Sequence, residues 1–317
     1  MRTLRNCFLF FLFASGVTLF AEDQALKVYV IKGPSGVGLI RLFDKPPEIP
    51  AYKVSVDLLS QADIMASRII AGEVQIGVLP VNLAAKIASS GKKIQVAAII
   101  GEGMVSLLTN DESIRSIEDL KGKEVSCAGQ GATPEFVFKR ILGAKGLNNV
   151  SLNFSLAYPE IAQSLIAGRI HYALLPEPFA TMALSGNKNI RSIGDIQQEW
   201  AGASGNPRIT NYPMTALVVN ADFAQKNQSA IKALLKEIEA SINWVEHNPH
   251  EAALLVEKHN FGLKAAIIEK AIPRSNYVYI PALEARAGIE TLLGLFLEDN
   301  PASIGNRLPD DNFYYHE

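Results

Sequence analysis

The sequence predicts an α/β protein of two Rossmann-like lobes that are joined by a two-strand hinge. Three observations carry this prediction: strands alternate with helices, part of that alternation repeats, and no linker rich in proline, glycine or serine separates two independent domains. With 317 residues, 48% of them hydrophobic and 20% charged, the chain is long enough for two packed domains. We expect a segment 1–21 that precedes the fold, one lobe of 22–108 plus 217–317, and a second lobe of 109–216.

The first part of the chain alternates between strands and helices of ordinary length. Apolar runs and helical spacing predict strands at Lys27–Ile31, Val54–Val56, Val74–Leu79 and Ile94–Ile100, and helices at Ala62–Ile70 and Leu83–Ala88. The last strand, IQVAAII, is apolar throughout, as expected for a strand that is buried on both faces. This order of elements indicates a sheet with parallel strands.

One segment of the alternation returns 96 residues later. The sequence AGEVQIGVLPVNLA at Ala71–Ala84 matches AGRIHYALLPEPFA at Ala167–Ala180 in its Ala-Gly, Leu-Pro and final Ala positions. Each copy follows a helix and precedes a short helix, a glycine and a strand. Chance similarity between two βα units is the alternative, but the shared order of elements favours two similarly built lobes.

The remaining elements fill the second lobe and return to the first. Strands are predicted at Lys123–Ala128 and Met214–Asn220, and a helix at Glu135–Leu142. The chain is then expected to be helical to its end, with helices at Ser229–Glu246, Leu263–Ala271 and Ala282–Leu297. We expect it to cross between the lobes through strands near Val105–Thr109 and Met214–Val219.

The first 21 residues have the pattern of a secretory signal peptide. Arg2 and Arg5 precede the apolar run Cys7–Phe20, and Ala21 offers a small residue at the cut. An earlier cut at Ala14–Gly16 and a retained N-terminal anchor are the alternatives. The apolar run is short for a membrane span, so we expect secretion into the periplasm or outside the cell.

The composition and motifs argue against most catalytic classes. A formal net charge of −2 gives no basic field for nucleic acid, and two cysteines form no disulfide scaffold or metal cluster. The chain contains no Walker A, GxSxG or HExxH motif. Pro249 interrupts the close pair His247 and His250, and Cys127 lies in a predicted strand as a small buried residue. We therefore expect no enzyme activity, no cofactor and no metal.

Two loops after predicted strands have the composition of ligand-binding turns. In Gly129–Glu135, Thr133 suits the N-cap of the following helix and Pro134 its first turn. The loop Lys32–Gly36 follows the first strand in the analogous place. Glycines let backbone N–H groups approach a ligand, and helix N-termini favour anionic or polar groups. Plain βα turns are the alternative for both loops.

Other polar and aromatic residues are expected beside these loops, where strand ends gather. Glu177 stands between two prolines and is expected to accept hydrogen bonds from a ligand or, alternatively, to cap a helix. Tyr158, Phe179 and Tyr212 are candidates for stacking on a flat ligand, with a role in the core as the alternative. The full set of candidate ligand-binding residues is Lys32, Gly33, Pro34, Ser35, Gln61, Asn82, Glu102, Gly131, Ala132, Thr133, Tyr158, Glu177, Phe179 and Tyr212.

Three segments together resemble a known family. SIEDLKGKEVSCAG at Ser116–Gly129, Ala-Gly at 167–168 and LPEPFA at Leu175–Ala180 are similar to the periplasmic solute-binding proteins of ABC importers, in the branch for sulfonates, taurine, nitrate and thiamine-precursor pyrimidines. The resemblance covers roughly residues 25–300. It implies a type II periplasmic binding fold, a cleft that closes on a solute, and a membrane permease with its ATPase as partners. We expect a monomer.

The resemblance leaves the solute open. The aromatic candidates and Glu177 favour a pyrimidine or vitamin-like heterocycle, because no arginine has an obvious cleft position. A small anion such as an alkanesulfonate, taurine or nitrate is the alternative, as is a sensor without transport. Thiamine-pyrimidine synthases share this fold but are cytoplasmic, which the predicted signal peptide argues against.

Overall fold

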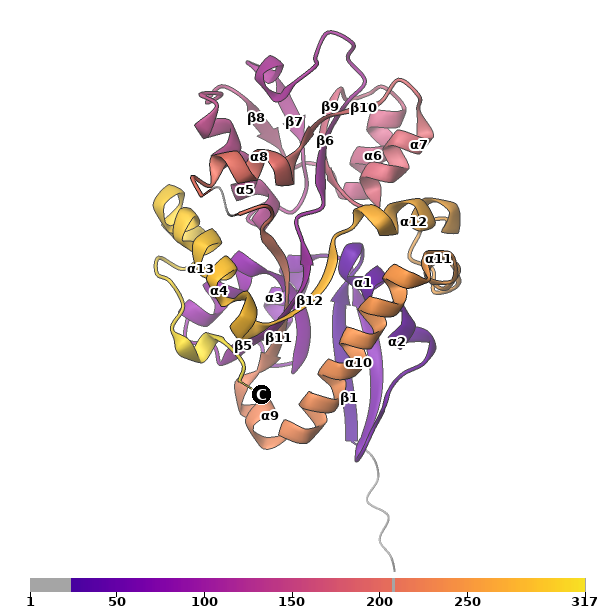
Figure 1. Ribbon diagram of the computed structural model, residues 1–317, viewed down its shortest axis with the longest axis vertical. Helices are drawn as coiled ribbons and strands as arrows, with labels where there is room; N and C mark the ends of the chain where they lie inside the picture. The colour runs from indigo at the N-terminus through magenta and orange to yellow at the C-terminus, as the bar shows by residue number, and fades with distance from the viewer. Residues whose placement is uncertain (1–23, 207–208, 317) are drawn as a thin grey trace, which may run out of the picture.

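The computed structural model describes residues 24–206 and 209–316 and contains two β-sheets in separate lobes. Figure 1 shows the lobes stacked along the long axis of the molecule, with helices packed around each sheet. The predicted signal peptide lies outside the described residues. Within the two described ranges, none of the helices combines the length and the apolar composition needed to cross a bilayer.

The first lobe is built on a seven-stranded sheet of mixed direction. Its strands in spatial order are β12 (Tyr277–Pro281), β5 (Ile94–Glu102), β11 (Pro213–Asn220), β4 (Ile76–Pro80), β1 (Gln24–Ile31), β3 (Tyr52–Leu59) and β2 (Glu48–Ile49). Strands β4, β1 and β3 are parallel, as predicted, whereas β11 is antiparallel to both β4 and β5. The direction of β11 follows from the chain path, because β11 begins beside the end of β5, where the chain returns from the second lobe.

The second lobe repeats the central part of this arrangement. Its five strands in spatial order are β10 (Arg191–Asp195), β6 (Val105–Thr109), β9 (Tyr172–Pro176), β7 (Glu124–Ser126) and β8 (Ser151–Asn153). The order β6-β9-β7-β8 has the same strand directions as β11-β4-β1-β3. The repeated sequence segment supplies β4 in one sheet and β9 in the other, so the prediction of two similarly built lobes is confirmed.

The helices pack around the two sheets. They are α1 (Pro34–Gly38), α2 (Ile40–Asp44), α3 (Ala62–Ile70), α4 (Val81–Ser89), α5 (Thr133–Ala144), α6 (Tyr158–Ile166), α7 (Phe179–Gly186), α8 (Ile196–Ala203), α9 (Ala221–Lys226), α10 (Gln228–His247), α11 (Pro249–Lys258), α12 (Ala265–Ala271) and α13 (Ala282–Asp299). Within the described ranges, 3₁₀ turns lie at Ile117–Leu120, Ile272–Arg274, Pro301–Ser303 and Asp311–Phe313. The residues that predicted α10 by their period, from Ile231 to Val245, are buried.

Two expectations about the chain path are wrong. The chain is not helical to its end, because β12 forms after α12 and pairs with β5 at the edge of the first sheet. The segments 105–109 and 214–219 do not cross between the lobes but lie inside one sheet each. The crossings precede them, between Glu102 and Val105 and between Ala203 and Pro213. We propose the lobe limits at these crossings.

The two crossing segments lie side by side at the hinge. The amide of Gly103 donates a hydrogen bond of 2.9 Å to the carbonyl oxygen of Tyr212. A Cβ atom on Gly103 would stand 2.5 Å from two ring carbons of Tyr212, closer than side chains tolerate. The hinge therefore requires glycine at this position because the Tyr212 ring lies directly against it.

Candidate functional site

The predicted site residues come mainly from loops and helix starts that follow strands of both sheets. Lys32 and Gly33 connect β1 to α1, and Pro34 and Ser35 begin α1. Gln61 precedes α3, Asn82 lies in the first turn of α4, and Glu102 ends β5. In the second lobe Gly131–Thr133 lead into α5, Tyr158 begins α6, and Glu177 and Phe179 follow β9, while Tyr212 lies in the hinge. The structure joins several of them across the lobes and leaves others apart.

Asn82, which is buried, connects the two lobes through hydrogen bonds to Gly131 and Thr133. Its Nδ2 donates to the Gly131 carbonyl oxygen at 2.7 Å and to the Ser303 carbonyl oxygen at 3.3 Å. Its Oδ1 accepts a hydrogen bond of 3.0 Å from Thr133 Oγ1. Asn82 and Thr133 are both 0% exposed, so each satisfies the other without water.

The start of α5 differs from the prediction. The N-cap of α5 is Ala132, not Thr133, and no side chain caps it. The Thr133 hydroxyl is directed to Asn82 instead, and the Gly131 amide donates to Glu135 Oε2 at 2.6 Å. Lys139, on the same helix, pairs with Glu135, which is buried, so the loop is held in place by the bond from Gly131 to Glu135. Gly129 and Gly131 have φ values of 70° and 82°, which favour glycine.

Two aromatic side chains of the second lobe and one glycine of the first lobe form a second contact between the lobes. The rings of Tyr158 and Phe179 stack with centroids 5.8 Å apart and planes at 17°. The Phe179 ring lies against Gly33, where a Cβ atom would stand 3.7 Å from it. The Tyr158 hydroxyl donates to the Ala128 carbonyl oxygen at 3.1 Å, and burial raises the pKa of Tyr158.

Glu177 combines a helix-capping role with an ion pair across the lobes. The Thr181 amide donates to Glu177 Oε2 at 3.0 Å, which is the capping alternative stated above. Glu177 Oε1 lies 3.0 Å from Arg274 Nε of the first lobe, as an ion pair rather than an aligned hydrogen bond. Glu177 is 1% exposed, and this burial raises the pKa of its carboxyl group although Arg274 and the Thr181 amide oppose the shift.

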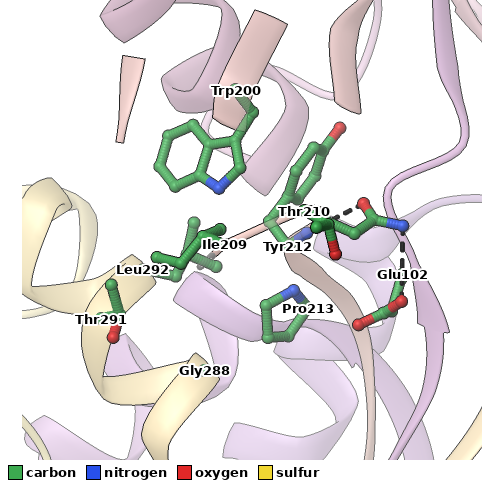
Figure 2. A pocket seen from close by; sticks show the side chains of 10 residues that line it. Glu102, Trp200, Ile209, Thr210, Tyr212, Pro213, Gly288, Thr291 and Leu292 are labelled. Atoms are coloured by element: carbon green, nitrogen blue, oxygen red, sulfur yellow. Dashed lines mark hydrogen bonds between the residues drawn. The ribbon is translucent and has the colours of Figure 1, made fainter. Parts of the chain in front are cut away.

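A cavity of about 230 Å³ lies beside the hinge, between α8 and α13 (Figure 2). It is lined by Glu102, Trp200, Ile209, Thr210, Asn211, Tyr212, Pro213, Gly288, Thr291 and Leu292. Two predicted site residues, Glu102 and Tyr212, are among them. Burial raises the pKa of Glu102, and Asn211 Nδ2 donates to Glu102 Oε2 at 3.4 Å.

Three predicted residues do not join these contacts. Lys32 and Gln61 are exposed, and no hydrogen bond within residues 24–206 and 209–316 ties either side chain to the second lobe. The Ser35 hydroxyl donates to the Ile31 carbonyl oxygen at 3.0 Å, so it holds its own loop.

Sequence reasoning missed Arg274 and Trp200. Arg274 lies in a 3₁₀ turn before β12, a strand that the sequence analysis did not identify. Trp200 lies on α8, which was also not predicted. Both residues lie between the lobes because segments that are distant in the sequence pack together. No local sequence pattern predicts such packing.

The sequence profile of the family described as NMT1/THI5 like matches residues 53–252. The chain belongs to the NMT1/THI5-like family. Among curated proteins, no sequence matches it significantly.

Several solved structures share the fold of this NMT1/THI5-like chain. An ABC transporter protein from Parabacteroides distasonis is 27% identical with a TM-score of 0.79, covering 93% of this chain and 100% of that one. The aliphatic sulphonate binding protein SsuA from Escherichia coli is 18% identical with a TM-score of 0.69, covering 91% and 93%. The nitrate-binding protein NrtA from Synechocystis PCC 6803 is 12% identical with a TM-score of 0.69, covering 88% and 82%. The NMT1/THI5-like chain thus has the type II periplasmic binding protein fold.

Proposed function

We propose that this protein is the extracytoplasmic solute-binding component of an ABC import system. It is secreted through the signal peptide of residues 1–21, captures a small solute between its lobes, and delivers the solute to a membrane permease with its ATPase. Family membership and the likeness to SsuA and NrtA support this role. The observation that carries the proposal is the direct pairing of loops from both lobes, at Asn82 with Thr133 and at Glu177 with Arg274.

Capture follows from these contacts by population shift. The polar groups that pair across the lobes become available when the lobes separate about the hinge. A solute that contacts both lobes is bound fully only in the closed form, so it shifts the population toward that form.

The solute class that we propose is a flat, nitrogen-containing heterocycle such as a pyrimidine. Phe179 stacks on Tyr158 and lies against Gly33 of the other lobe, so separation of the lobes uncovers an aromatic face on which a flat ring can stack. The Glu177 carboxylate accepts hydrogen bonds from ring or amine N–H groups. Arg274 faces Glu177 at this place, so the two side chains together offer no net positive charge to a sulfonate or nitrate ion.

The test is to purify the chain from residue 22, record its native mass before and after denaturation, and then measure thermal shifts. We expect pyrimidines to raise the melting temperature in a concentration-dependent way, and taurine and nitrate to have no effect. Phe179→Leu should abolish the shift because it removes the flat ring. Phe223→Leu on α9, at the far end of the first lobe (Figure 1), is the matched control and should retain it. If only taurine or nitrate raises the melting temperature, the solute is an anion rather than a heterocycle. If none of the tested solutes raises it, the result contradicts capture.

A further inference from the structure

The cavity beside the hinge contains an unpaired hydrogen-bond donor. Trp200 is 1% exposed, and its Nε1 has no partner among the residues that the structure describes. Figure 2 shows the nitrogen edge of the indole turned toward the other lining residues. A buried N–H without a partner destabilises the fold, and native proteins rarely leave one. The cavity therefore has a fixed position for a hydrogen-bond acceptor.

A second polar group reaches the cavity from the end of β5. Glu102 is half-buried. Among the described residues, only Asn211 donates a hydrogen bond to its carboxylate, and this bond is long, at 3.4 Å. It is the only carboxylate among the described lining residues. A carboxyl group there attracts a hydrogen-bond donor and repels an anion.

The remaining walls combine polar and apolar side chains. Thr210 and Asn211 line the cavity from the hinge segment, and Thr291 lines it from α13. Ile209 and Pro213 line the cavity from the returning hinge segment, and Gly288 and Leu292 line it from α13. A cavity of about 230 Å³ is smaller than the usual drug-sized site.

This cavity is separate from the aromatic contact that the proposed solute would use. The Tyr212 ring packs edge-on against Trp200 with centroids 5.7 Å apart, and it is fully buried. Neither Tyr158 nor Phe179, from the stacked pair, lines the cavity.

We propose that this cavity is a binding site for a small uncharged molecule that presents a carbonyl-type acceptor to Trp200 and an N–H or O–H donor to Glu102. Cyclic ureas and lactams have this chemistry, with a flat apolar face for Ile209, Pro213 and Leu292. The proposal does not depend on the function proposed above, because it uses different residues.

The two tryptophans of the chain make the test direct. Protein labelled with ¹⁵N-tryptophan gives one indole N–H signal each for Trp200 and Trp244, and Trp244→Phe assigns them. Titration with 2-imidazolidinone or uracil should move the Trp200 proton signal downfield, as expected for a new hydrogen bond, and the shift should saturate at about 1 mM or above. A Trp200 signal that does not move with either probe would overturn the proposal and leave the cavity to water.

Two glycines of α13 provide a matched pair of variants. A Cβ atom on Gly288 would stand 3.5 Å from Pro213 Cγ, so Gly288→Leu fills the cavity from its wall. Gly294 has open space around its Cβ position, so Gly294→Leu makes the same helix-favouring change on the same helix. Gly288→Leu should weaken probe binding at least about tenfold, whereas Gly294→Leu and Phe179→Leu should leave it unchanged. Equal binding by Gly288→Leu and Gly294→Leu would contradict the assignment.

Discussion

Cys127 lies just after β7 with its thiol buried against the core of the second lobe. It is 1% exposed, and its amide donates to the Asn153 carbonyl oxygen at 2.9 Å. Burial raises the pKa of the thiol to about 12, with the Glu135 carboxylate adding to the shift. Because the thiolate is the reactive form, this cysteine is a packing residue rather than a nucleophile.

We expect Cys127 in the folded chain of residues 22–317 not to react with Ellman's reagent at slightly alkaline pH. Unfolding in urea should release one reactive thiol per chain, because Cys7 precedes this segment. The measurement is absorbance after mixing, with and without denaturant. Rapid reaction of the native protein would show that the thiol is accessible.

The burial of Glu177 determines how the stability of the folded protein changes with pH. Burial raises the pKa of its carboxyl group, so the folded protein holds this proton more tightly than the unfolded chain does. The associated stability is present below the unfolded pKa of about 4.3 and is lost as pH rises through the raised value. Glu177→Gln stays neutral and still accepts from the Thr181 amide, so it removes this loss.

The melting temperature of Glu177→Gln minus that of the natural protein should therefore grow as pH rises from about 4 to neutral. Thermal unfolding across that range measures the difference, and Glu239→Gln, at an exposed position in the middle of α10, is the control for a generic charge change. A difference that is constant or that shrinks with pH would contradict the assigned sign.

At the scale of elements, the starts of α4 and α5 are held together by one buried polar cluster. Asn82 binds Gly131 and Ser303 through Nδ2 and receives Thr133 Oγ1 at Oδ1. Removal of Asn82 or Thr133 leaves a polar group of the other buried residue unpaired, which costs about 1–3 kcal/mol.

Asn82→Ala and Thr133→Val should each lower the free energy of unfolding by about 1–3 kcal/mol, and the double variant by less than the sum. Urea denaturation of the four proteins gives this double-mutant cycle. Ser90→Ala, which breaks a hydrogen bond within the C-terminus of α4 alone, is the control. Strict additivity would show that Asn82 and Thr133 do not interact in solution.

The sequence predicts elements with strong local patterns and misses those that depend on packing. The period of α10 and the apolar runs of β5 and β11 predict these elements closely. β12 is a short strand at the sheet edge, with three half-buried residues, and its pattern is too brief to distinguish it from a loop. Thr133 has the residue type of an N-cap, but a buried partner 51 positions away takes its hydroxyl. The ion pair of Glu177 with Arg274 and the cavity beside Trp200 likewise arise only when distant segments meet.

At the scale of the whole molecule, contacts between the lobes hold the hinge in one position. Asn82 and Arg274 of the first lobe reach Thr133 and Glu177 of the second. Phe136 of α5 also packs on Phe296 of α13 with centroids 5.4 Å apart, and Arg140 binds Asp299 at 2.9 Å. The hinge itself consists of two adjacent segments, so the balance between open and closed forms depends on these contacts and on solute.

The double variant Asn82→Ala, Arg274→Ala should therefore shift the unliganded protein toward an open form, because it removes one polar contact at each of two places between the lobes. We expect a larger radius of gyration by small-angle X-ray scattering, while circular dichroism stays unchanged because both sheets remain intact. Arg286→Ala, which removes ion pairs to Glu290 and Asp311 within the first lobe, is the control and should keep the original radius. A bound solute should bring the double variant back toward the compact form, since its contacts to both lobes replace the lost ones. An unchanged radius in the double variant would mean that the aromatic contacts and α13 alone keep the lobes together.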